Sequence, residues 1–174
     1  GYQFSQAIIH DVAYSLLLFG QRRALHRAIA EWYASEHPHL AEAGSSLLAH
    51  HWSHAIDPDE PETRQPAIMA LQRAGEQTLL RCSYREAIPF FERALHLLAV
   101  DDDFAAQQQI VRMQFNLSQA RWRLGDHSMA LTNLDSALVT AQRIDDGVGE
   151  ADVLRQFGNI AYVQGDLYTA QQHF

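Results

Sequence analysis

Three histidines within five residues have the spacing best suited to metal chemistry in this chain. His50 and His54 lie one helical turn apart, so on a helix they could share a zinc ion. A zinc site needs a third ligand, and His39 or Glu42 would have to fold back to supply it. The alternative is that His51 packs inside the fold while His50 and His54 face water. We expect this second arrangement, and we predict no bound metal and no cofactor.

The sequence gives still less indication of a catalytic or metal-binding role for the other reactive side chains. The acidic run at residues 101–103 lacks the alternating ligands and the glycine of an EF-hand loop, so a solvated turn is expected there. Cys82 has no features of a nucleophile, and we expect a small packed residue. The basic patch of Arg22, Arg23 and Arg27 is expected to face solvent or a neighbouring domain. The chain has no lysine and therefore no GxxxxGK(S/T) nucleotide-binding loop, and we expect no enzymatic activity from it.

Composition narrows the class of partner. The 174 residues are 47% hydrophobic and 20% charged, as in folded domains, and the formal net charge is −8. A negative protein is a poor match for nucleic acid or for an anionic membrane, so neither is expected as a ligand. A single cysteine excludes an intrachain disulfide, and no apolar run reaches 18 residues, so we expect a cytoplasmic location. Because the chain lacks a starting Met and stops inside a repeat, we interpret it as a piece of a longer protein.

Apolar periodicity predicts helices throughout and no strand longer than a few residues, so the fold class is all-α. The acidic, proline-containing segment 57–63 is expected to link an N-terminal helical segment, 1–56, to a repeat region, 64–174. Gly20 is expected to end the first helix. The predicted helices cover about residues 4–18, 22–34, 40–55, 64–80, 84–98, 104–124, 127–144 and 149–164.

A short phrase recurs along the C-terminal two thirds of the chain. Residues 124–130 (LGDHSMA) and 164–170 (QGDLYTA) match at an offset of 40, and a fainter copy, 81–87 (RCSYREA), lies 43 residues before the first. A recurrence of this length predicts stacked helical hairpins that form an α-α superhelix. The expected repeats are residues 64–100, 104–144 and a truncated 149–174.

Small residues recur where the two helices of each hairpin should touch. Gly125 and Gly165 suit a left-handed turn between the helices, and Asp126 and Asp166 suit the N-cap that follows. The second helices supply a small–bulky–small pattern: Ala87, Phe91 and Ala94; Ala130, Leu134 and Ala137; and Ala170 and Phe174. The first helices supply further small and apolar positions: Leu71, Ala74 and Gly75; Leu117; and Leu154, Phe157, Gly158 and Ala161. This region resembles a tetratricopeptide repeat (TPR) array of the longer kind found in signalling proteins. The resemblance implies a module that binds other proteins.

The N-terminal segment carries a second resemblance. Residues 4–14 (FSQAIIHDVAY), 21–31 (QRRALHRAIAE) and 48–52 (LAHHW) are similar to the region that joins the ATPase module to the repeats in STAND-type signalling ATPases and multidomain class III adenylate cyclases. Gln6 departs from that pattern, in which a histidine is common. The resemblance implies a parent protein with an ATPase and a cyclase or DNA-binding domain, with the repeats used for protein–protein interaction or regulation.

The helical register predicts which residues face the concave groove of the array. The aromatic and polar residues typical of peptide grooves are expected there: Gln72, Glu76, Arg112, Phe115, Gln119, Trp122, Arg123, Asp152, Arg155, Asn159 and Tyr162. Glu76 and Gln119 replace the polar residues of the chaperone-binding carboxylate clamp, so that ligand is not expected. We expect a protein or peptide partner, which includes other domains of the same parent chain; the alternative is a small-molecule sensor, as in STAND-type transcriptional activators.

The last repeat is expected to expose the face that a following repeat would cover. This face lies near Ala161, Ala170 and Phe174. An exposed apolar end predicts homodimerisation through the truncated repeat.

Overall fold

The structure is a computed structural model, and it describes residues 7–39 and 46–173, with side chains from residue 11 onward. The described elements confirm the all-α helical-repeat class: they are helices, and their one strand-like pairing is an isolated bridge between Asp57 and Glu60. The chain divides into two compact units, Gly1–Arg73 and Ala74–Phe174, with the division inside helix α5 (Arg64–Leu80).

The first unit contains α1 (Ala7–Leu16), α2 (Phe19–Glu36), α4 (Ser46–Ala55) and the short 3-10 turn η1 (Pro61–Thr63). Helices α2 and α4 pack against each other. The expectation that Gly20 ends a helix is wrong, because Gly20 is the second residue of α2. The break comes earlier, at Leu18, whose extended backbone (ψ 156°) starts α2 and whose N–H donates to the Gln21 side chain at 3.0 Å.

The acidic segment expected as a linker folds against α2. Arg23 forms an ion pair with Asp57 at 2.7 Å, and Arg27 forms one with Glu60 at 2.5 Å. The hydrogen bond from Arg23 lowers the pKa of Asp57 below its usual value. Thr63 is buried, and its hydroxyl donates to the Glu60 carbonyl at 2.7 Å. Two of the three arginines expected to face outward are therefore engaged within the unit, and a domain boundary at residues 57–63 stays a prediction.

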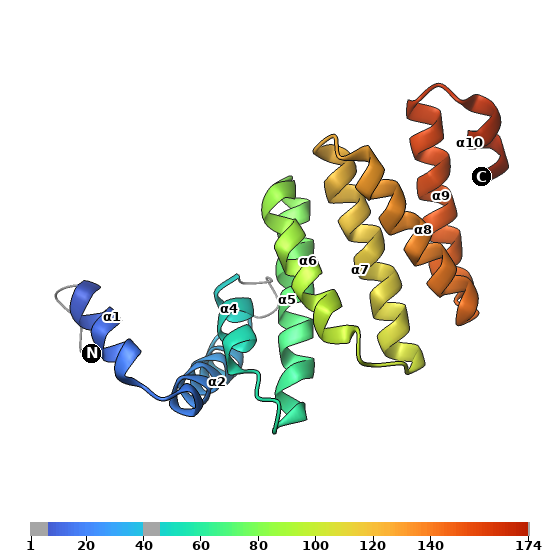
Figure 1. Cartoon of the computed structure of the whole chain (residues 1–174). Helices are drawn as coiled ribbons and strands as arrows, with labels where there is room; N and C mark the ends of the chain where they lie inside the picture. Colours follow the sequence, from blue (N-terminus) through green and yellow to red (C-terminus); the bar gives the residue numbers. More distant parts are fainter. Residues whose placement is uncertain (1–6, 40–45, 174) are drawn as a thin grey trace. The chain divides into compact units, whose positions relative to one another are not determined.

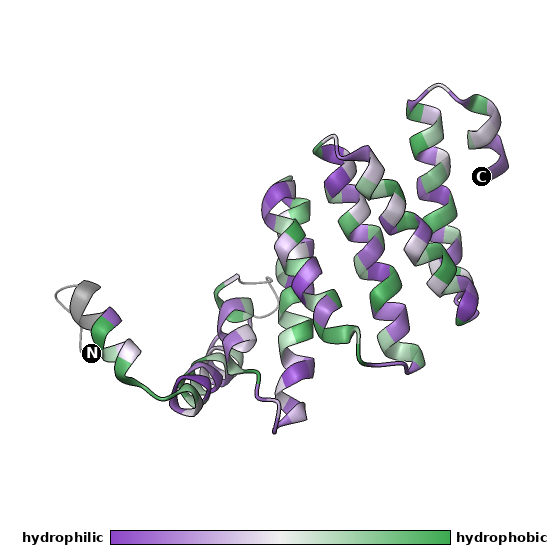
Figure 2. Cartoon of the chain, in the orientation of Figure 1, coloured by the Kyte–Doolittle hydropathy of each residue, from purple (hydrophilic) through white to green (hydrophobic). Residues whose placement is uncertain are grey.

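The second unit is a row of helical hairpins. Its elements are the end of α5, then α6 (Tyr84–Leu98), α7 (Phe104–Arg123), α8 (His127–Arg143), α9 (Gly147–Val163) and α10 (Leu167–His173). From α6 to α10, each helix packs against the next one along the chain (Figure 1). Polar and apolar residues alternate around these helices, as expected where each buries one face (Figure 2).

The hairpin turns form as predicted, with one substitution. Gly125 and Gly165 take positive φ angles of 84° and 81°. Asp126 and Asp166 then cap α8 and α10, with Asp166 accepting from the Thr169 N–H at 3.0 Å. Cys82 occupies the equivalent left-handed position before α6, with φ 59°, and is exposed. The expectation of a packed Cys82 is wrong, because the residue lies in the tight turn itself.

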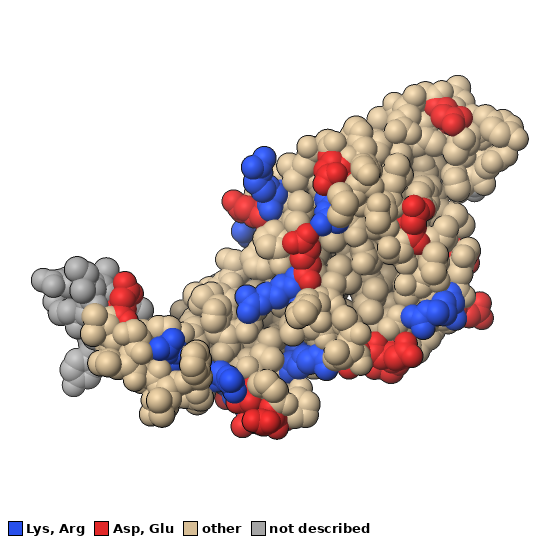
Figure 3. All heavy atoms as spheres, in the orientation of Figure 1, with Lys and Arg blue, Asp and Glu red and all other residues tan. Residues whose placement is uncertain are grey.

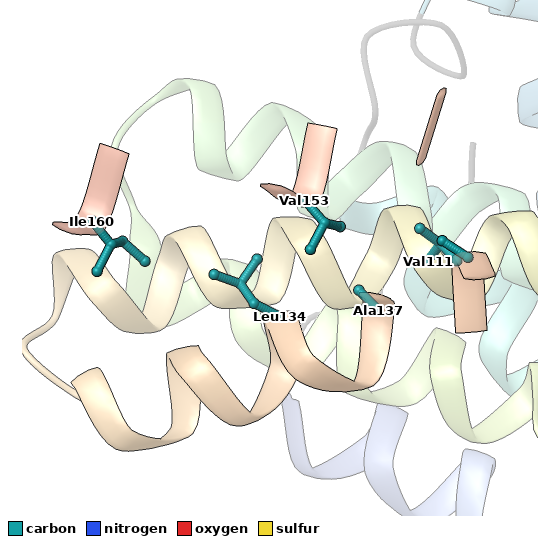
Figure 4. Close-up of a cluster of buried hydrophobic side chains, with 6 residues drawn as sticks. Val111, Leu134, Ala137, Val153 and Ile160 are labelled. Carbon is teal, nitrogen blue, oxygen red and sulfur yellow. The ribbon is translucent and has the colours of Figure 1, made fainter. Parts of the chain in front are cut away.

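Small residues bring the helices together. The predicted contact positions in α6 (Ala87, Phe91 and Ala94) and in α8 (Ala130, Leu134 and Ala137) are all fully buried, which confirms their inward orientation. Between α7, α8 and α9 the core contains Val111, Leu134, Ala137, Val153 and Ile160, and Figure 4 shows Val153 and Ile160 directed from α9 toward the other two helices. The continuous core therefore rests on alanines flanked by branched aliphatic residues.

The end of the last described hairpin differs from expectation. Ala161 and Ala170 are buried, because α10 packs against α9. Phe174 lies outside the described residues. The exposed apolar residues at this end of the hairpin include Val163, Leu167 and Tyr168. Homodimerisation stays a prediction, but the two alanines are not a surface through which it could occur.

A substitution at Gly75 tests the close packing between α5 and α6. A methyl group built on Gly75 would lie 2.7 Å from Cε1 of the buried Phe91 ring, so Gly75→Ala is expected to destabilise the second unit by about 1–3 kcal/mol. Gly147→Ala is the matched control, because no atom lies within 4 Å of its added methyl group. Thermal unfolding followed by circular dichroism measures both variants. Equal melting temperatures for the two would contradict the close approach.

A second variant tests the left-handed turn at residue 82. Cys82→Gly restores the residue type found at the two equivalent turns and removes the steric cost of a Cβ at positive φ, so a gain of about 1 kcal/mol is expected. Gly125→Ala makes the opposite change in the next repeat and should lose a similar amount. Urea titration of the free energy of unfolding checks the pair, and a destabilised Cys82→Gly variant would refute the explanation.

Candidate functional site

A groove between α7 and α9 contains two neighbouring hollows. The first, the Asn116 hollow, has a volume of about 600 Å³. Helix α7 contributes five residues to its wall, and the start of α9 with its N-cap contributes five more: Gln108, Val111, Arg112, Phe115 and Asn116; and Asp146, Val148, Gly149, Asp152 and Val153. Its size is that of a small-ligand or peptide side-chain site.

The second, the Tyr162 hollow, lies further along the same pair of helices and has a volume of about 380 Å³. Its wall combines amide, aromatic and aliphatic side chains: Gln119, Trp122, Arg123, Gln156, Asn159, Ile160, Tyr162 and Val163. We call the two hollows together the α7–α9 groove.

Eight of the eleven predicted groove residues line these hollows. They are Arg112, Phe115 and Asp152 in the first, and Gln119, Trp122, Arg123, Asn159 and Tyr162 in the second. Two others act on the rim through ion pairs, since Glu76 binds Arg112 at 3.0 Å and Arg155 binds Asp152 at 2.8 Å. Gln72 belongs to the first unit and lines neither hollow.

The groove aromatics divide into packed and exposed side chains. Phe115 and Trp122 are partly buried against the core of α7, α8 and α9. The Trp122 ring also stacks on His127 with a centroid separation of 4.0 Å. Tyr162 is 63% exposed. Trp122 is therefore held in place, while the Tyr162 ring is free to contact a ligand.

Charge is unevenly distributed along the groove. Arg112 and Arg155 are ion-paired, whereas Arg123 forms no ion pair with any residue that the structure describes. On the face drawn in Figure 3, acidic and basic side chains of the second unit are interspersed, without a large region of one sign. Ion pairing therefore offsets the charges of Arg112 and Arg155, whereas the charge of Arg123 has no ion-pair partner among the described residues.

Sequence reasoning missed several lining residues, of which Asn116 is the most informative. Asn116 is 91% buried, with only 9% of its surface exposed, and it lines the first hollow. It lies one helical turn after Arg112 and three residues before Gln119, both of which were predicted to face the groove. Extending that stripe by its helical spacing would have found it.

The histidines form a cluster of imidazoles in the first unit. His26 of α2 joins the three histidines of α4, with ring centroids 5.5 Å from His50, 5.0 Å from His51 and 5.0 Å from His54. His26 Nδ1 lies 2.8 Å from His51 Nδ1, and its Nε2 lies 2.9 Å from the Tyr14 hydroxyl. Sequence reasoning missed His26, because only packing brings α2 against α4.

This cluster has the geometry of a hydrogen-bonded contact between helices. His50 and His54 are exposed and His51 is half-buried, which is close to the expected non-metal arrangement. His54 Nδ1 donates to the His50 carbonyl at 2.8 Å. No group of three or more potential ligands among the described residues could hold a metal ion, and Glu42 lies outside them.

Burial changes the protonation of two of these imidazoles. Desolvation, and secondarily the three neighbouring histidines, lowers the pKa of His26 from 6.5 to about 4. Desolvation also lowers the pKa of His51. Both rings are therefore neutral at physiological pH, and a neutral ring supplies the unprotonated nitrogen that an N–H···N hydrogen bond between them needs.

The acidic run and the remaining basic residue have structural partners. Asp103 caps α7 by accepting from the Ala106 N–H at 3.0 Å, and Asp102 pairs with Arg143 at 3.4 Å. These contacts agree with a capping turn. Arg22 stacks over the Tyr14 ring at 4.9 Å and donates to the Ser15 carbonyl.

Comparison with known proteins adds no family. No protein-family model, curated protein or solved structure matches this chain. Across residues 7–39 and 46–173, none of the helices combines the length and the apolar character needed to cross a membrane. The fold therefore defines the class as an all-α helical-repeat protein.

The depressed pKa of His26 predicts a pH-dependent stability of the first unit. Because the folded pKa (about 4) lies below the ordinary 6.5, the unfolded chain binds more protons between these values. Stability should therefore fall as pH drops through 6.5, by up to about 3 kcal/mol at pH 4. In a Trp122→Phe variant, fluorescence of Trp32 and Trp52 during urea titration reports this unit alone.

Two further variants control this measurement. His26→Gln cannot titrate and should flatten the pH profile, whereas His127→Gln, in the second unit, should leave the profile unchanged. If the free energy of unfolding of the chain with His26 intact is constant from about pH 7.5 to 4.5, a buried neutral His26 is ruled out.

Proposed function

We propose that this chain is a non-catalytic, TPR-like module that binds a protein partner through the α7–α9 groove. The observation that carries the proposal is the groove itself, with two hollows lined by Phe115, Trp122 and Tyr162 and by arginine and amide side chains. Aromatic and arginine side chains contribute most of the binding energy in protein interfaces. A concave face on stacked hairpins is also the surface that helical-repeat proteins use for partners.

We also propose that the module works within a cytosolic signalling ATPase or class III adenylate cyclase. This part rests on the similarity of residues 4–14, 21–31 and 48–52 to the region that precedes the repeats in those proteins. In such a parent the groove would engage a partner or another domain and couple that contact to the catalytic domains. The chain itself would supply recognition, since it holds no nucleotide-binding loop.

Peptides selected on the chain by phage display test the groove. Tyr162→Ala should weaken their binding about tenfold or more, because an exposed aromatic ring that becomes buried on binding is a typical hot spot. Fluorescence anisotropy with the selected, labelled peptides measures the change.

Tyr168→Ala is the matched control for this experiment. Tyr168 is 73% exposed, close to the 63% of Tyr162, but it belongs to α10 and lines neither hollow. Selected peptides that bind both variants as tightly as the parent chain would exclude the groove. ATP hydrolysis or cyclic AMP synthesis by the chain would refute its non-catalytic role.

A further inference from the structure

Asn116 differs from the other buried polar side chains of the second unit. Gln107 donates to the Asp101 carbonyl at 2.8 Å, Ser118 donates to the Phe115 carbonyl at 2.7 Å, and Asn133 accepts from Arg121 at 2.5 Å. Asn116 is 91% buried, and its side chain has no hydrogen-bond partner among the described residues.

The surroundings of the Asn116 amide point to a role in binding. The amide is not fully enclosed, so water can reach it through the hollow in the free chain. Asn116 lines the Asn116 hollow, where the ring of Phe115 and the aliphatic side chains of Val111 and Val153 form the apolar part of the wall. A ligand in this hollow would supply the missing partner.

The donor and acceptor pattern of Asn116 limits the chemistry of that ligand. The side chain offers an N–H₂ donor beside a C=O acceptor, which match the C=O and N–H of a peptide main chain. Adenine presents a similar pair, but nucleotides also carry phosphates. The rim disfavours anions, since Glu76 and Asp152 are paired with Arg112 and Arg155, while Asp146, the N-cap of α9, adds a carboxylate that forms no ion pair among the described residues.

The length of the groove also suits an extended peptide. The two hollows follow α7 from residue 108 to residue 123. Between Val111 and Trp122 the helix rises about 16 Å, which is the reach of about five extended residues. An extended segment could therefore contact Asn116 and Tyr162 together.

We propose that the Asn116 hollow binds one main-chain amide of an extended peptide whose neighbouring side chain is basic. The Asn116 amide pairs with the peptide group, the apolar wall covers it, and the excess carboxylate on the rim attracts a lysine or arginine. The net charge of −8 on the whole chain favours the same kind of partner. This proposal rests on the groove-binding function proposed above and specifies the ligand within it.

The test uses labelled, capped heptapeptide libraries whose central residue is lysine, glutamate or leucine, with neutral residues around it. In fluorescence anisotropy the lysine library should bind at least about fivefold tighter than the glutamate library. Methylation of the peptide nitrogens should abolish binding, because it removes the N–H that Asn116 would accept. Adenosine and N-acetyl-lysine methylamide serve as small-molecule competitors and should not displace the peptide.

Asn116→Leu separates a ligand-binding amide from a structural one. The leucine is close in size and removes an unpaired polar group, so the melting temperature should stay the same or rise while affinity for the lysine library falls about tenfold or more. Gln171→Leu replaces an exposed amide of α10, outside both hollows, and should change affinity less than about threefold.

Several results would overturn the proposal. A lower melting temperature for Asn116→Leu would show that the amide is structural. Unchanged peptide binding in Asn116→Leu, together with a loss in Tyr162→Ala, would refute this site and leave the groove function standing. A small-molecule competitor that binds as tightly as the heptapeptides, or an absence of binding by every library, would also refute a peptide site.

Discussion

The second unit depends on how closely its helices approach one another. Ala87, Ala94, Ala130 and Ala137 are fully buried, and at Gly75 even a methyl group would overlap the Phe91 ring. Small side chains allow helix axes to approach to about 8–10 Å, at which distance larger neighbours fill the remaining gaps. Gly149 has the same role at the start of α9, where an added Cβ would lie 3.0 Å from Val111. The groove inherits this geometry, because Val111 and Gly149 also line its first hollow.

The turns, together with the small residues, set the geometry of each hairpin. A positive φ at Gly125 or Gly165 ends one helix, and the aspartate that follows caps the next. This pairing fixes the direction of each hairpin with two residues. Cys82 makes the same left-handed turn, although its Cβ disfavours a positive φ. Packing of the surrounding helices therefore holds the backbone in a locally strained conformation.

Both units contain buried polar groups, but the two groups differ in how they are satisfied. In the first unit, Tyr14, His26 and His51 form a chain of hydrogen bonds that links α1, α2 and α4, and desolvation keeps the imidazoles neutral. In the second unit, the Asn116 side chain has no such partner among the residues that the structure describes. The histidine cluster is therefore complete in itself, whereas the groove contains a group that protein contacts leave unsatisfied. This contrast is why the proposed site lies in the groove and not at the histidines.

Sequence alone determined the features that depend on local spacing. The all-α class, the helices from residue 64 onward, the glycine turns, the aspartate caps and the inward alanines all follow from helical periodicity and turn chemistry, which act over a few residues. Eight of the eleven groove residues were likewise found from the register of the first helices. Only tertiary packing decided the rest. It placed His26 beside the histidines of α4, folded the acidic segment onto Arg23 and Arg27, and left the Asn116 side chain without a hydrogen-bond partner in the described part of the chain. These contacts join residues far apart in the chain, and whether a buried amide is satisfied depends on every neighbour around it, which no short window of sequence contains.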